Sequence, residues 1–207
     1  MTAVSDFRLR GLSLNGGRPA ISTTVAYDDD SGLYLGGALT SGDTRRFGIR
    51  FLGHNEFIGY ARRLTPTLSG EIGVSNTQSN SYVSSRFSGS YTEGYLGLST
   101  ERLSVRFSYT PSFFERGTGA LYVDVNGNHR LRDNARLFGH IGILTPVGRG
   151  NPNILPRSRY DTRIGAALEM RRGEIQLGWV RSGADRRYLK ERRQARDALV
   201  VGASWFF

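Results

Sequence analysis

Cysteine is absent from this chain of 207 residues, and lysine occurs only once, at position 190. Without thiols the chain forms neither disulfide bonds nor thiolate metal sites, although an oxidising envelope compartment remains open to it. No apolar run approaches the roughly 20 residues that a transmembrane helix requires. No helical period persists over any useful length either. These absences exclude a helical membrane protein and a cysteine-held metal centre.

Arginine and glycine are abundant instead. The net charge is +10, almost all of the positive charge is arginine, and there are 27 glycines. Arginine favours bidentate contacts with phosphate and carboxylate groups, but a GC-rich genome explains the same bias. The length predicts a single domain over residues 1–207. No secretory signal precedes the first expected strand; if the protein is exported, its signal has been removed and Met1 is not the natural start.

The repeating unit of the sequence is a segment of about ten alternating residues followed by a turn, which is typical of a transmembrane β-barrel. Twelve such segments are expected: residues 7–13, 20–27, 32–40, 57–64, 68–77, 88–99, 103–112, 120–130, 135–144, 160–170, 174–181 and 198–207. A thirteenth is conceivable at residues 46–54. We interpret it as an extension of the preceding hairpin beyond the membrane, because an even number of strands places both termini on one side.

The connections between these segments alternate in length. Five are tight turns of typical turn-forming residues, at 28–31, 65–67, 100–102, 132–134 and 171–173. Five longer loops fall between them, at 41–56, 78–87, 113–119, 145–159 and 182–197. Short periplasmic turns and long extracellular loops are the pattern of outer-membrane barrels, whereas a soluble sandwich has no reason to sort its loops in this way.

The two faces of each segment differ in polarity. In residues 103–109, for example, Leu103, Val105 and Phe107 alternate with polar residues that include Arg106. Arginine facing lipid at the bilayer midplane costs about 2–4 kcal/mol, so the charged face is expected to line the lumen. The sequence therefore predicts an all-β, antiparallel transmembrane β-barrel of about 12 strands.

The last segment ends on aromatic residues. Gly202, Trp205 and Phe207 resemble the C-terminal signal of bacterial outer-membrane proteins, in which a glycine, an aromatic residue and a terminal phenylalanine have this spacing. We expect Trp205 and Phe207 to face lipid in the interfacial girdle. The signal predicts residence in the bacterial outer membrane and recognition by the barrel-assembly machinery.

The N-terminal sequence carries a family resemblance. Residues 4–13 (VSDFRLRGLS), followed by Gly17, Arg18, Pro19 and Ala20, resemble the opening of the TorF-type porin family of proteobacterial outer-membrane β-barrels. Weaker similarities occur at residues 31–36 and 94–99 and in the closing segment. The resemblance implies a barrel of about twelve strands with channel activity. It implies no catalytic residue and no established substrate.

Charged residues on the inward faces are the candidate site. The expected lumen-lining positions are Arg8, Arg10, Glu71, Arg106, Asp124, Arg136, His140, Arg163, Glu169 and Glu174. Rings of charged side chains select ions, and arginine favours anions. The opposite interpretation carries similar weight, because inward Arg/Glu pairs can simply form the polar core of a filled barrel. Five arginines against four carboxylates predict a slight anion preference.

Other functions have less support in the sequence. The arginine-rich loop 185–196 could bind outer-leaflet glycolipid, or it could be a solvated hairpin. Nucleic-acid binding is not expected, because the arginines are spread over every loop without a stacking platform. His54, His129 and His140 show no metal spacing and no adjacent nucleophile motif, which leaves a lipid-modifying enzyme as a weaker alternative.

We therefore predict a monomeric outer-membrane channel, without cofactor or metal, for passive diffusion of small polar or anionic solutes. The alternative is a plugged barrel that serves as a structural or interaction protein, binding outer-leaflet glycolipid through its basic loops. Loop 145–159, with Pro146, Pro152 and Pro156, is stiff enough to constrict a lumen.

Overall fold

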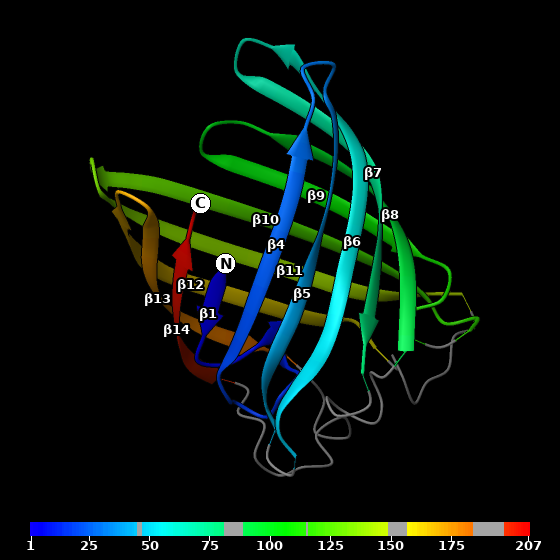
Figure 1. Cartoon of the computed structure of the whole chain (residues 1–207). Helices are drawn as coiled ribbons and strands as arrows, with labels where there is room; N and C mark the ends of the chain where they lie inside the picture. The colour runs from blue at the N-terminus through cyan, green and yellow to red at the C-terminus, as the bar shows by residue number, and fades with distance from the viewer. Residues whose placement is uncertain (45–46, 81–88, 115, 149–156, 184–196) are drawn as a thin grey trace.

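A computed structural model of the chain describes residues 1–44, 47–80, 89–114, 116–148, 157–183 and 197–207. Twelve strands form a closed antiparallel barrel (Figure 1). They are β1 (Thr2–Val4), β4 (Ala20–Asp28), β5 (Leu33–Thr44), β6 (Gly48–Thr65), β7 (Leu68–Ser79), β8 (Gly89–Ser99), β9 (Leu103–Thr110), β10 (Gly119–Arg132), β11 (Ala135–Val147), β12 (Arg159–Met170), β13 (Gly173–Ser182) and β14 (Asp197–Trp205). Each strand pairs with its neighbours in the sequence, and β1 closes the barrel between β14 and β4. The predicted fold is confirmed.

The two ends of the barrel differ in their connections. All five predicted tight turns lie between strands at one end, which we call the turn end; the other end, the loop end, has four of the predicted longer connections and the short one between β5 and β6. The chain starts and finishes at the turn end, where the amino group of Met1 donates to the carbonyl oxygen of Trp205 at 2.8 Å (Figure 1). The first turn is held by Asp29, whose carboxylate accepts the Ser31 N–H at 2.8 Å. The bond from the Ser31 hydroxyl and this backbone bond lower the pKa of Asp29.

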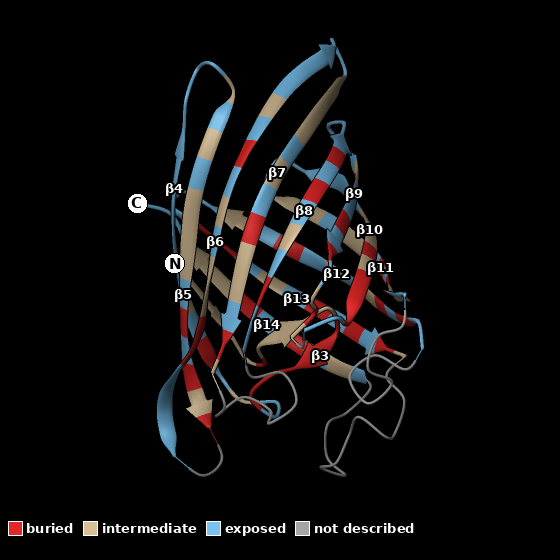
Figure 2. Ribbon diagram, turned by 90° about the vertical axis from the view of Figure 1, so that its right-hand side faces the viewer, coloured by how far each residue is buried: buried red, intermediate tan, exposed pale blue. Residues whose placement is uncertain are grey.

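Side chains alternate between the two faces of the wall, as the strand period of two requires. On β7, Ile72 and Val74 are 55% and 47% exposed on the outside, whereas Ser75 is buried on the inside. The same alternation of exposed and covered positions runs along most strands (Figure 2). The barrel therefore has an apolar outer face and a polar interior. Among the described residues, no helix has the length and apolar character needed to cross a membrane.

The first predicted strand, residues 7–13, is wrong. The wall strand is β1, only three residues long, and residues 5–19 turn into the barrel as a hairpin of β2 (Arg8–Leu9) and β3 (Leu12–Ser13). Arg10 and Gly11 form its tip with φ of 48° and 76°, the left-handed values of a two-residue hairpin turn. We call residues 5–19 the inward hairpin.

A buried carboxylate fixes the inward hairpin. Asp6 accepts the Arg8 Nε–H at 2.5 Å and the Ser13 hydroxyl at 2.6 Å. Alternation of Phe7 and Leu9 with Arg8 and Arg10 imitates a wall strand in the sequence. In the structure it belongs to a small hairpin that has the barrel interior on all sides.

The predicted loop at residues 41–56 is also wrong, because β5 continues to Thr44 and β6 begins at Gly48. This long hairpin includes residues 48–54, which confirms that they extend a hairpin rather than form a thirteenth strand; residues 45–46 lie outside the described part. The register shifts between Thr40 and Ser41. Next to this bulge, Gly53 of β6 lies close to β7. A Cβ on Gly53 would lie 2.1 Å from the carbonyl oxygen of Gln78, so β6 and β7 can approach this closely only because residue 53 is glycine.

The apolar core lies inside the barrel, at its loop end. Leu12 of the inward hairpin packs among Tyr91, Phe113, Tyr122 and Leu144 of the wall and its connections. Buried positions surround β3 in Figure 2. The hairpin thus occupies the loop-end half of the lumen, and an open cavity lies beside it and towards the turn end.

Candidate functional site

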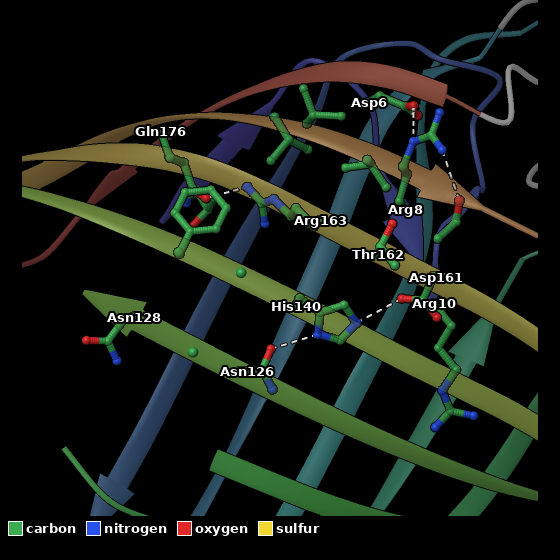
Figure 3. A pocket seen from close by; sticks show the side chains of 18 of the residues that line it. Asp6, Arg8, Arg10, Asn126, Asn128, His140, Asp161, Thr162, Arg163 and Gln176 are labelled. Atoms are coloured by element: carbon green, nitrogen blue, oxygen red, sulfur yellow. Dashed lines mark hydrogen bonds and ion pairs between the residues drawn. The ribbon is translucent and has the colours of Figure 1, made fainter. Parts of the chain in front are cut away.

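A cavity of about 680 Å³ lies between the inward hairpin and the barrel wall, lined mainly by β10 to β13 and also by β1, β4, β5, β9 and β14 (Figure 3). We call it the chamber. The hairpin residues from Asp6 to Gly11 lie over its loop-end side, and its lining extends to Thr100 and Arg136 near the turn end. Of the predicted lumen residues, Arg8, Arg10, Arg136, His140 and Arg163 line it.

Arg10 anchors the hairpin over the chamber. Its Nη2 donates to Glu93 Oε2 at 2.5 Å, and its guanidinium carbon lies 4.3 Å from the centre of the Tyr122 ring. The rings of Tyr91 and Phe113 are 5.6 Å and 5.5 Å away. A desolvated arginine that combines an ion pair with aromatic faces is held firmly. Arg10 is therefore a structural anchor of the hairpin.

Gly11 lets the hairpin tip touch the wall. A Cβ at this position would lie 2.5 Å from Asp161 Cβ and 2.9 Å from Ser182 Cβ. With a φ of 76° as well, the position requires glycine for both space and backbone conformation.

A hydrogen-bonded cluster of side chains lies on the part of the wall that the hairpin tip touches (Figure 3). His140 Nε2 lies 2.8 Å from Asp161 Oδ1, and His140 Nδ1 lies 2.7 Å from Asn126 Oδ1. The Tyr122 hydroxyl donates to the Asp161 carboxylate at 3.2 Å. Both ring nitrogens of His140 are thus engaged by neighbouring side chains of the wall. This arrangement orders the wall.

Arg163 differs from the other chamber arginines in having no carboxylate partner among the described residues. One of its terminal nitrogens donates to Gln176 Oε1, and its guanidinium carbon lies 4.7 Å from the centre of the Phe138 ring. Its Nε is buried and makes no hydrogen bond within the described part of the chain. Arg163 consequently presents to the chamber a positive charge that no ion pair within the described residues neutralises (Figure 3).

The chamber lining is positive as a whole. Four arginines face it, Arg8, Arg10, Arg136 and Arg163, against the two aspartates Asp6 and Asp161. Arg136 is paired, with Nε and Nη2 at 3.0 Å and 2.6 Å from Glu174 Oε2 and Nε at 3.5 Å from Glu169 Oε1. Because Glu93 and Glu174 do not line the chamber themselves, an ion inside it meets more cationic than anionic groups.

The remaining predicted positions lie on the interior face outside the chamber. Arg106 donates from Nε and Nη2 to Glu71 Oε1 at 3.0 Å and 2.7 Å. Glu71 also accepts the Tyr34 hydroxyl at 3.0 Å, and Asp124 accepts an Asn126 amide hydrogen at 2.7 Å. Arg8 and Arg10 also lie inside the barrel, but on the inward hairpin and not on a wall strand as predicted.

Sequence reasoning missed several partners that complete the site. These are Asp6, Glu93, Tyr122, Asn126, Asp161 and Gln176. Asp161 lies two residues before Arg163, so strand alternation places both side chains on the same face. This signal was available in the sequence, but Asp161 stands at the edge of its predicted segment. No group of histidine and acidic residues suited to a metal occurs in the described ranges.

Other predictions fall outside the site. Trp205 and Phe206 are 44% and 64% exposed, and Phe207 lies fully exposed beyond β14, while Gly202 is buried on its inner face; their role as an insertion signal remains a prediction. The basic loop 185–196 and the prolines at 152 and 156 lie outside the described residues.

Solved structures with the same fold include two porins. The chain aligns over its full length with 99% of the NanC porin at a TM-score of 0.69 and 10% identity. It also aligns over its full length with 99% of the KdgM porin at a TM-score of 0.61 and 11% identity, and a structure of KdgM in complex with disordered oligogalacturonate gives 0.60. Such low identity establishes the shared fold alone.

Sequence comparisons place the chain in a family. None of the curated proteins matches it. The resemblance to TorF-type porins is not tested by these matches and stays a prediction. One family model, described as "Bacterial protein of unknown function (Gcw_chp)", matches residues 1–206. With practically its whole length covered by that match, the chain belongs to the Gcw_chp family of bacterial proteins.

Proposed function

We propose that the protein is a monomeric channel of the bacterial outer membrane for passive diffusion of small polar or anionic solutes. The support is a barrel with an apolar outer face, a charged interior and the fold of known porins. The resemblance of the N-terminal residues to TorF-type porins favours the same assignment. Gly202, Trp205 and Phe207 would direct the chain to the barrel-assembly machinery, and membrane lipid would surround the wall.

One observation carries the choice of solute. Arg163 faces the chamber without a carboxylate partner in the described part of the chain, in a lining of four arginines and two aspartates. A half-buried guanidinium without an ion-pair partner attracts a carboxylate or phosphate passing through the chamber. The structure of KdgM with oligogalacturonate shows that a barrel of this fold can hold a carboxylate-bearing sugar chain.

Reconstitution in planar bilayers tests the proposal. Discrete conductance steps are expected, with a reversal potential in a KCl gradient that reports moderate anion preference. An oligogalacturonate added on one side of the bilayer should reduce the current. Folded, inserted protein that never conducts would rule the channel out.

The inward hairpin favours a second candidate, a plugged barrel with a structural or interaction role. Its apolar residues fill the loop-end half of the lumen, and Arg10 fixes it there. A plugged barrel would bind ligands at its loops without passing current. Wild-type protein that is silent in bilayers, beside a hairpin-deleted variant that conducts, would establish this candidate.

Membrane residence makes a prediction of its own. Val74→Arg, in the middle of β7 on the outer face, should destabilise folding into bilayers by about 2–4 kcal/mol, because arginine would face hydrocarbon. Ile49→Arg, in the loop-end extension of β6, should cost only about 0–1 kcal/mol near the interface. Denaturant titration of folding into lipid vesicles measures the free-energy cost of each variant. Equal costs at the two positions would contradict the placement of Val74 in the hydrocarbon region and of Ile49 near the interface.

A further inference from the structure

A groove of about 700 Å³ interrupts the outer face of the barrel near the turn end. Its floor is Gly127 of β10 and Gly139 of β11, which are direct register partners. Its apolar lining comes from side chains of β10 to β13, namely Val125, Leu137, Ile141, Ile164 and Trp179. The apolar side chains of the groove point outward, whereas the chamber lies inside the barrel; the wall between them is shared, because Gly127, Gly139 and Thr162 line both spaces.

The groove exists because two side chains are missing from an otherwise continuous apolar wall. A Cβ on Gly139 would meet nothing within 4 Å, and one on Gly127 would meet only the Arg102 carbonyl oxygen at 3.8 Å and Leu103 Cδ1 at 3.9 Å. Neither glycine has the positive φ that would require glycine for conformation. Neither local crowding nor backbone strain explains the pair, and the open space along the wall is its main consequence.

One end of the groove is cationic. Arg102, in the turn between β8 and β9, and His129, on the outward face of β10, line the same space as the apolar side chains. The Arg102 carbonyl accepts the Asn128 N–H at 2.9 Å, which fixes this turn beside β10. Neither Arg102 nor His129 forms an ion pair with a carboxylate in the described ranges. The slot is thus largely apolar, and Arg102 supplies positive charge at its turn end, although Glu101 and Glu169 line an adjoining pocket together with Arg102 and His129.

We propose that this groove binds one glycerophospholipid, with an acyl chain over Gly127 and Gly139 and the phosphate at Arg102 and His129. An elongated apolar slot with a cation at one end is complementary to an amphiphile with an anionic head group. The turn end, where the polar end of the groove lies, is the periplasmic side in the proposed orientation. This inference rests on the proposed membrane residence and adds a specific lipid to it.

Native mass spectrometry of the detergent-purified barrel, titrated with phosphatidylglycerol, tests the site. The wild type should bind one lipid in preference to further ones. Gly139→Leu fills the groove and should abolish that first binding step, whereas Gly94→Leu, on an equally open outward position of β8, should leave it intact. Arg102→Ala should weaken binding about fivefold, and Arg171→Ala, in a different turn, should not weaken it. Diacylglycerol lacks the phosphate, so the wild type should bind it no better than Arg102→Ala does.

Two results would overturn the proposal: equal lipid binding by Gly139→Leu and Gly94→Leu, or a wild-type dimer that Gly139→Leu dissociates, since the groove would then be a protein interface. Heat-modifiable migration in detergent gels, recorded for every variant, keeps this test separate from the proposed function. A folded barrel that binds no lipid at the groove refutes only the lipid site. A chain that never migrates as a folded barrel refutes membrane residence itself.

Discussion

Replacing residues 5–19 with an Asn-Gly turn is expected to raise the single-channel conductance several-fold. Val4 and Ala20 are direct partners on the adjacent antiparallel strands β1 and β4, so a two-residue turn can join them without disturbing the barrel. The replaced segment contains Leu12 and Leu14, which are only 6% and 3% exposed inside the lumen. Removing it opens the loop-end half of the lumen, and single-channel recording measures the gain.

Two glycine variants provide a matched comparison for this prediction. Gly11 and Gly17 have nearly equal φ values of 76° and 77°, so alanine costs about 1–2 kcal/mol of backbone strain at either position. Only at Gly11 would the new Cβ also collide with the wall, because a Cβ at Gly17 meets nothing within 4 Å. Gly11→Ala should therefore displace the hairpin tip and increase conductance, and Gly17→Ala should not. Unchanged conductance in the hairpin-deleted barrel would show that the constriction lies elsewhere.

Removing the uncompensated charge at Arg163 is expected to abolish the anion preference. Arg163→Gln deletes the cation, whereas Gln176→Glu leaves the arginine in place and supplies the carboxylate that it lacks. Both changes make the chamber one charge more negative, so both should shift the reversal potential in a KCl gradient towards cation selectivity. The measurement is a reversal potential at several salt concentrations, since screening weakens the effect at high ionic strength.

Arg106→Gln is the control for the selectivity prediction. It changes the net charge by the same amount, but Arg106 pairs with Glu71 and does not line the chamber. Its reversal potential should stay closer to that of the wild type. If Arg106→Gln and Arg163→Gln shift the potential equally, total charge and not the chamber determines selectivity.

The barrel was predictable because its signals are local. Alternation along β7 and β9 distinguishes the outer face from the interior, and the parity of turn lengths distinguishes the two ends. These patterns follow from strand geometry and from an apolar surrounding, so they can be recognised without knowing which residues contact each other. The inward hairpin has the same alternation as a wall strand. Only Gly11, at a tip that must have positive φ, separates the two possibilities, and a glycine alone is a weak signal in a chain with 27 of them.

The pairing of charges was not predictable from parity. Parity assigns Arg10, Arg136 and Arg163 to the interior but does not say which carboxylate each one meets. The Arg10 partner, Glu93, is 83 residues away and is reached only because the hairpin turns inward. Within the described residues Arg163 meets an amide and not a carboxylate, because the register between β12 and β13 places Gln176 within its reach.

The position of the inward hairpin has a consequence for assembly. The wall residues that it contacts lie far apart in the sequence, with Glu93 on β8 and Asp161 on β12. The barrel closes only when the three residues of β1 pair with β14. The hairpin is synthesised first, but the strands that enclose it come later. The hairpin therefore reaches its final contacts only after β8 and β12 have joined the sheet. We expect a chain that closes with residues 5–19 outside the barrel to lack both the ion pair of Arg10 and the contact of Gly11 with the wall.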